Sequence, residues 1–225
     1  MTILPPKTPP NSAPPNTGPP APARPATGLP DHTWGQSARD RLFEQRVVFL
    51  WGRLDDAAAG HLAAELMTLD ATGDDPVHLH IDSPGGTLEA AFCLIDVIDL
   101  LGVQLTATCV GQAAGPSIGP LAVAHHRRAT PHTRFRLSEP VLELSGSTRQ
   151  LDAWATSHRA QLKRFCERLA TSVGQAPETI ERDLSSGRFL DAAGALDYGL
   201  IDEICGPGAR VYPMPGPRLG FGPRP

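Results

Sequence analysis

Two short segments of this chain place glycines and small residues where backbone groups could take part in chemistry. The first, residues 81–86 (IDSPGG), separates an apolar run from an amphipathic one. A Pro-Gly-Gly turn that opens a helix presents unhindered N–H groups, which can bind an anion or a developing oxyanion. The same turn can also act only as a tight connection between a strand and a helix. The segment alone leaves both interpretations open.

The second segment, residues 111–119 (GQAAGPSIG), follows another apolar run. Its small residues allow a helix and a strand to pack closely, and Pro116 suits the first turn of a helix. We therefore expect a second strand-to-helix junction here.

The histidines offer little support for a metal centre. His78 and His80 would share one face of a strand, but the apolar residues around them favour a partly buried strand over a chelating pair. His125 and His126 are adjacent, so they seldom point at one ion, and no third ligand is evident. We predict no metal and no cofactor. Nothing resembles a phosphate-binding loop, so we expect no nucleotide either.

Bulk composition excludes several classes of partner. A net charge of −4 gives no electrostatic reason to expect nucleic acid or an anionic membrane. No apolar run reaches the ~18 residues of a membrane span, and the N-terminus lacks the pattern of a secretory signal. We expect a cytoplasmic protein. The cysteines lie far apart without metal-ligand spacing, and we interpret all of them as buried free thiols: Cys93, Cys109, Cys166 and Cys205.

The elements that must position these segments follow an α/β pattern. Short apolar runs alternate with amphipathic segments, which predicts a mostly parallel sheet with crossover helices. The expected strands are 46–51, 77–82, 103–110, 133–137 and 200–204. The helix after the second strand carries an apolar face made by Leu88, Ala91, Phe92, Ile95 and Ile98.

A longer helix is expected at about 148–173, and two tails flank the folded part. The apolar stripe of this helix includes Trp154, His158 and Phe165 and is longer than a small sheet needs, so we expect part of it to contact another subunit. Residues 1–32 form a Pro-rich segment, with 11 of the 24 prolines in the first 30 positions, and 207–225 is rich in Gly and Pro. We predict disordered tails around one domain at 33–206.

The order and separation of the two motifs resemble the proteolytic subunit of the Clp protease, a self-compartmentalising serine peptidase of family S14. Further matches are 47–52 (VVFLWG), 180–183 (IERD), 188–190 (RFL) and 197–203 (DYGLIDE), so the resemblance covers about 40–205. It implies a crotonase-like α/β fold with a long handle helix, and heptameric rings that stack into a tetradecamer. It also implies a role in protein quality control with a Clp ATPase unfoldase as partner.

The resemblance assigns the family's Ser-His-Asp triad to positions that lack those side chains. Gly115 stands at the nucleophile position, Ser138 at the position of the base and Gly187 at that of the Asp. We therefore expect a degenerate, catalytically inactive subunit that assembles with an active paralogue. Gly85 and Gly86 match the family's oxyanion and substrate-binding segment, so extended peptides could still bind weakly.

Two alternatives stay open at this point. Ser117 could be the nucleophile if Gly115 and Pro116 were an insertion, which would make the chain an active endopeptidase with a base foreign to the family. The other alternative is a free-standing peptide-binding protein. In the matching family segment His125, His126 and His132 lie away from the nucleophile.

Carboxylates could in principle replace the missing acid. Asp183 and Asp191 flank Gly187, but without a histidine to orient we interpret each as a surface carboxylate.

Overall fold

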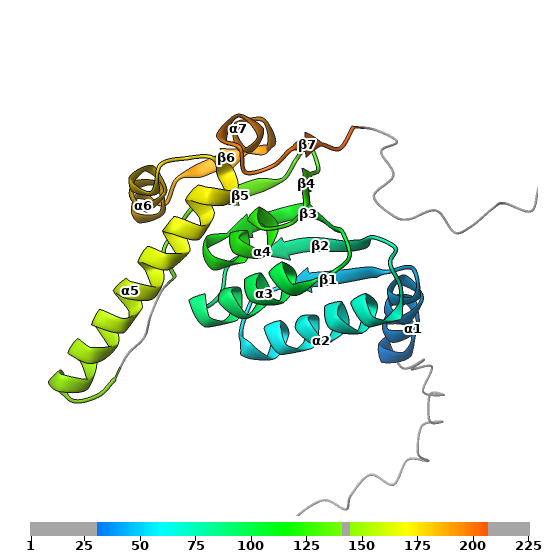
Figure 1. Ribbon diagram of the computed structural model, residues 1–225, viewed down its shortest axis with the longest axis horizontal. Helices are drawn as coiled ribbons and strands as arrows, with labels where there is room; N and C mark the ends of the chain where they lie inside the picture. Colours follow the sequence, from blue (N-terminus) through cyan, green and yellow to red (C-terminus); the bar gives the residue numbers. More distant parts are fainter. Residues whose placement is uncertain (1–30, 141–144, 207–225) are drawn as a thin grey trace, which may run out of the picture.

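The computed structural model describes residues 31–140 and 145–206 (Figure 1). The predicted tails lie almost wholly outside these residues. The described part is a mixed α/β structure with a mostly parallel sheet, as the sequence predicted.

A seven-stranded sheet forms the centre of the molecule. Its main path runs β1-β2-β3-β4-β7, and β5 pairs with β3 and with β6. Every pairing is parallel except that of β5 with β6. The strands are β1 (Val47–Trp51), β2 (Val77–Ser83), β3 (Leu105–Ala114), β4 (His126–Ala129), β5 (Arg134–Arg136), β6 (Phe189–Asp191) and β7 (Glu203–Ile204).

Helices pack on one face of β1, β2 and β3 (Figure 1). Alternation along the strands turns Val48, Leu50 and Leu79 toward these helices, where they join one apolar core. The helices of the described residues, wherever they pack, are α1 (Asp31–Glu44), α2 (Asp56–Thr72), α3 (Leu88–Leu100), the short η1 (Gly115–Ser117), α4 (Ile118–Ala122), α5 (Thr148–Val173), α6 (Pro177–Ser186) and α7 (Ala192–Tyr198).

Helix α5 is only half covered. A capping box between Ser147 and Gln150 starts it, and Gly174 in the left-handed region ends it. Its C-terminal half buries one face, which includes Phe165; this ring meets Phe92 edge-on at a ring-centroid distance of 6.1 Å. The N-terminal half projects from the body, and Trp154 is 43% exposed (Figure 1). This projecting half is available for contact with another chain.

Some details differ from the sequence expectations. The third strand continues four residues beyond the predicted end, because residues 112–114 pair with β5. Strands β4 and β6 were not predicted. Cys93 is exposed, so the interpretation of all cysteines as buried was wrong; α3 buries residues on its opposite face, such as Leu94 and Ile95.

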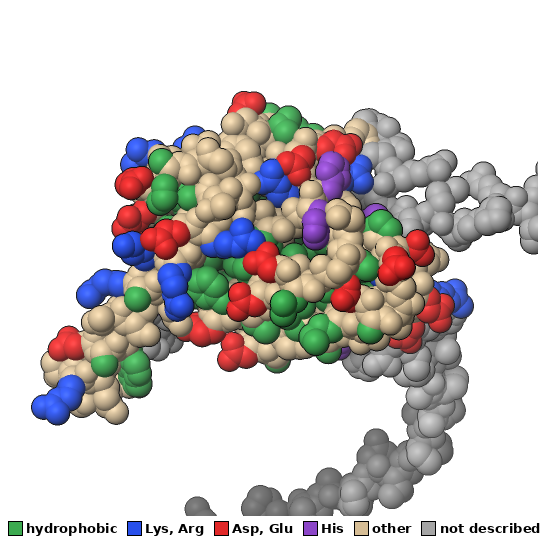
Figure 2. Space-filling model, in the orientation of Figure 1, with side chains coloured by type: hydrophobic (Ala, Val, Ile, Leu, Met, Phe, Trp, Pro, Cys, Tyr) green, Lys and Arg blue, Asp and Glu red, His purple; other side chains and the backbone are tan. Residues whose placement is uncertain are grey.

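No helix within the described ranges is long and apolar enough to cross a membrane. Figure 2 shows Lys and Arg side chains mixed with Asp and Glu on the face toward the viewer.

Candidate functional site

The Pro-Gly-Gly turn is fixed by the loop that follows β1. The Leu54 N–H donates to the Gly85 carbonyl at 2.8 Å, and the Thr87 N–H donates to the Leu54 carbonyl at 3.0 Å. A Cβ at Gly86 would lie 2.1 Å from the Leu54 oxygen, so only glycine fits there. The Thr87 hydroxyl then caps α3 by accepting from the Ala90 N–H. The turn therefore both connects β2 to α3 and bonds the loop after β1.

Gly115 lies directly beyond the end of β3 and faces the backbone of Ser138. Its φ of +49° is in the left-handed region. A Cβ at this position would lie 2.9 Å from the Ser138 carbonyl oxygen and 3.4 Å from its Oγ. The two positions are thus immediate neighbours, and the space that a side chain would need is occupied by a carbonyl group.

Pro116 affects what the same turn can donate. Stabilisation of an oxyanion at this point would use a backbone N–H of the first turn, and proline has none. The Ile118 N–H is directed at the carbonyl oxygens of Gly115 and Pro116. The turn therefore offers no N–H from residue 116 to a substrate.

Ser117 is fully buried, with no exposed surface. Its Oγ accepts from the Ala114 N–H at 3.0 Å and donates to the Ala114 carbonyl at 2.9 Å. The Ser83 carbonyl lies 3.4 Å away on the other side. These bonds close the first turn after β3, and such a position does not suit a nucleophile that must reach a substrate.

Gly187 lies beside the segment that carries Ser138. The Leu137 N–H donates to the Arg188 carbonyl at 2.8 Å, and the Glu139 N–H donates to the Leu184 carbonyl at 3.3 Å. Gly187 ends α6 in the left-handed region with φ of +70°, and a Cβ there would lie 3.7 Å from an Arg136 guanidinium nitrogen. The fold thus places Gly115 against Ser138, and it places Gly187 next to the segment that carries Ser138.

The family model for Clp protease matches residues 32–207, which is most of the chain. The chain belongs to the Clp protease family. Membership implies ring-shaped oligomers with other subunits of the family and cooperation with Clp ATPases. The positions to which the sequence resemblance assigns the triad hold two glycines and a serine, Gly115, Gly187 and Ser138.

Asp183 departs from the expectation for a surface carboxylate. It is only 4% exposed. Its Oδ2 accepts from the Arg188 guanidinium at 2.8 Å and from the Tyr198 hydroxyl at 3.0 Å. Burial raises the pKa of Tyr198, and the bond to Asp183 raises it further. The carboxylate is therefore part of a buried structural network.

The three members of this network lie in three of the family motifs. Asp183 ends the IERD motif, Arg188 begins the RFL motif, and Tyr198 lies in the DYGLIDE motif. What the sequence did not reveal was their common contact with Asp183.

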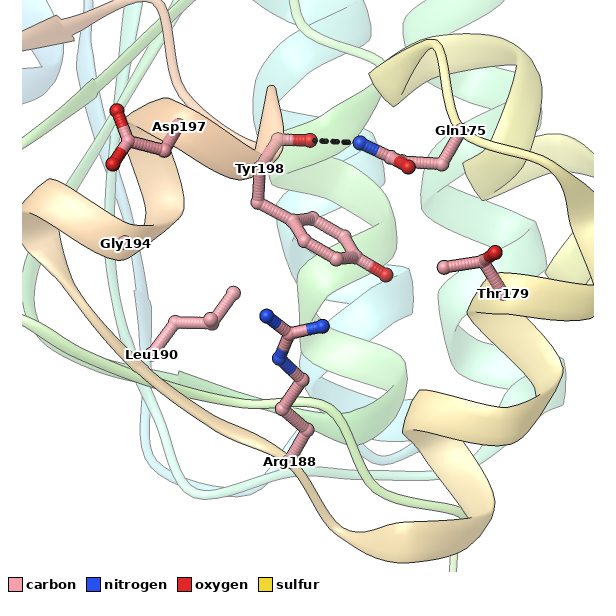
Figure 3. Close-up of a pocket in the computed structure, with 7 residues that line it drawn as sticks. All are labelled: Gln175, Thr179, Arg188, Leu190, Gly194, Asp197 and Tyr198. Atoms are coloured by element: carbon pink, nitrogen blue, oxygen red, sulfur yellow. Dashed lines mark hydrogen bonds between the residues drawn. The ribbon is translucent and has the colours of Figure 1, made fainter.

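A pocket of about 350 Å³ lies next to this network, between the start of α6 and α7 (Figure 3). Figure 3 shows the Arg188 guanidinium beneath the Tyr198 ring, with a distance of 5.2 Å from its central carbon to the ring centroid. The Gln175 amide donates to the Tyr198 carbonyl at 3.1 Å. The Arg188 guanidinium, which lines this pocket, thus already interacts with the Asp183 carboxylate and with the Tyr198 ring. The lining residues are Gln175, Thr179, Arg188, Leu190, Gly194, Asp197 and Tyr198.

Two of the histidines that follow the second motif, His125 and His126, lie far from Ser117. His125 Nδ1 accepts from the N–H of Leu105, the first residue of β3, whereas Ser117 follows its last residue. A strand of that length spans roughly 30 Å. His126 lies 3.3 Å from a Glu203 carboxylate oxygen, and His132 is exposed. Within the described residues no group of three His, Cys, Asp or Glu side chains could hold a metal.

Proposed function

We propose that this chain is a catalytically inactive member of the Clp protease family that joins active subunits in a ring. Its contribution is to the assembly rather than to peptide hydrolysis. The cytoplasm is the compartment we propose for it.

One observation carries the proposal: the Ser138 carbonyl oxygen lies where a side chain at position 115 would have to extend. A nucleophile at this point needs a Cβ, and a Cβ would be 2.9 Å from that oxygen. The space that a side chain at position 115 would need is therefore occupied by the Ser138 carbonyl. This argues against a site that is complete except for the loss of one nucleophilic side chain.

The absence of a base at this position supports the same conclusion. Ser138 occupies the position assigned to the histidine, and a serine hydroxyl does not accept a proton near neutral pH. The side chain of the neighbouring Glu139 is exposed to solvent. Without a base to remove its proton, a serine hydroxyl such as that of Ser117 is a very poor nucleophile, and loss of one triad member typically lowers kcat by about 10⁴-fold or more.

The remaining structure is suited to assembly. The projecting half of α5 exposes Trp154 and offers a helical surface to another subunit. The turn at Gly85 and Gly86 is held by backbone bonds with the loop after β1, so weak binding of an extended peptide along its backbone is compatible with the proposal.

Recovery of the full chain from its native cytoplasm, followed by native mass spectrometry, tests the assembly. We expect a ring that contains this chain together with an active paralogue. A stable species near 23.9 kDa would contradict ring membership and would favour a free-standing binding protein. Labelling of the same sample with a fluorophosphonate is expected on the paralogue only, which also serves as the positive control.

A further inference from the structure

The pocket between α6 and α7 contains a carboxylate that the network beside it does not use. Arg188 is already bonded to Asp183 at 2.8 Å and stacked on the Tyr198 ring. Asp197 also lines the pocket, from the side of α7, and it is exposed (Figure 3). It makes no hydrogen bond and no ion pair with any residue that the structure describes. The free charge of this pocket is therefore negative, which suits a cationic side chain.

The surface around the pocket is acidic as well. Residues 175–198, which form α6, β6, α7 and the turns between them, carry five carboxylates and two arginines, a net charge of −3. The carboxylates belong to Glu178, Glu181, Asp183, Asp191 and Asp197. A positively charged segment near this surface is attracted to it over a distance of about one Debye length, ~8–10 Å.

Residues 207–225 have the complementary charge. Their charged side chains are Arg210, Arg218 and Arg224, and there is no Asp, Glu or Lys among them. Leu219 follows Arg218 directly, and Leu190 in the pocket lining is an apolar partner for it. The chemistry of this segment therefore fits the pocket in both charge and apolar character.

The connection is long enough for a contact within one chain. Strand β7 leads into this segment, and α7, which carries Asp197, packs against β7. Asp197 and Gly206 are nine positions apart in the sequence, so at most ~30 Å separates them. Arg218 is twelve positions beyond Gly206, and twelve residues span about 37 Å in polyproline geometry. Arg210 is only four positions beyond Gly206, which corresponds to about 12 Å. Arg218 is thus the first arginine whose reach covers the whole possible separation.

We propose that residues 207–225 bind the pocket between α6 and α7 of the same chain, with Arg218 paired to Asp197. This contact goes beyond the proposed function and does not depend on it. Tethering gives an effective concentration of ~1 mM, so even a site with a Kd of ~100 µM would be about 90% occupied. The contact fixes the segment at one place on the surface and closes the pocket to other cationic peptides.

Zero-length cross-linking with a carbodiimide tests the pair, because the reagent joins an amine to a carboxylate that is in contact with it. Lys7 and Lys163 are the only lysines of the chain, so Arg218→Lys in the full chain adds a reporter amine to a low background. We expect this variant to couple to Asp197, as located by peptide mass spectrometry. The yield should be severalfold higher than that of Arg210→Lys, the matched control. Addition of Asp197→Asn to Arg218→Lys should abolish the coupled product.

An internal control and the mass of the product make the result decisive. Lys163 Nζ lies 4.0 Å from Glu167 Oε1, so coupling of these two residues shows that the reagent has worked. The product from Arg218→Lys should run at the mass of one chain on a denaturing gel. Twice that mass would overturn the proposal, because a second copy would then supply the segment. Equal coupling of Arg210→Lys and Arg218→Lys to Asp197 would overturn it, and so would coupling at Lys163 alone.

Discussion

Replacement of Gly115 by alanine measures directly whether the Ser138 carbonyl leaves room for a side chain at position 115. Gly174→Ala is a matched control, because Gly174 also has a positive φ, of +71°, but a Cβ there would meet nothing within 4 Å. Both changes introduce the left-handed strain of a non-glycine residue, which costs about 1–2 kcal/mol. Only Gly115→Ala also crowds a backbone oxygen, at 2.9 Å, and such overpacking typically costs a further ~1–3 kcal/mol.

Thermal unfolding at one fixed protein concentration is a suitable assay, because oligomerisation makes Tm depend on concentration. For a domain of this size, 1 kcal/mol corresponds to about 2–4 °C in Tm. We therefore expect Gly115→Ala to lower Tm by roughly 2–12 °C more than Gly174→Ala does. Equal shifts in the two variants would refute the reasoning, since they would mean that a side chain fits at position 115.

Three other predictions concern Ser117, Tyr198 and the cysteines. Ser117→Ala leaves the buried Ala114 N–H without its acceptor, so we expect a loss of about 1–3 kcal/mol in unfolding free energy, measured by thermal denaturation; a drop in peptidase activity at unchanged stability would contradict this structural role. The pKa of Tyr198 is raised in the folded state, so the stability that this group contributes is complete below the ordinary tyrosine pKa of about 10 and is lost as pH rises further. The Tyr198→Phe variant should therefore lose less Tm above that pH than the unaltered chain does. Identical profiles of Tm against pH in the two proteins would be evidence against this role of Tyr198. Native alkylation followed by mass spectrometry should modify the exposed Cys93 first, whereas burial raises the pKa of Cys166 to about 11 and should protect it; faster modification of Cys166 would contradict the packing.

Periodicity was sufficient to predict the unit formed by β2 and α3. The spacing of Leu88, Ile95 and Ile98 identified the buried face of α3, and the glycines of the PGG motif identified the turn. These features are local, because they depend on residues within about three helical turns of each other.

Features that depend on distant contacts were missed. Residues 111–114 (GQAA) include a glycine and two alanines, which have low strand propensity, yet they extend β3 because β5 supplies a pairing partner. Asp183 is buried, and its carboxylate accepts a hydrogen bond from Tyr198, fifteen positions further along the chain. At the site, the sequence identified positions 115, 138 and 187, but the contact of the Ser138 carbonyl with Gly115 depends on tertiary packing alone.

Fluorophosphonate labelling of the purified native ring, with the modified residue located by peptide mass spectrometry, tests the central proposal most directly. The account predicts stoichiometric label on the active paralogue and none on this chain. Label on this chain, at Ser117 above all, would contradict the account, because it would require the buried hydroxyl to become both exposed and activated.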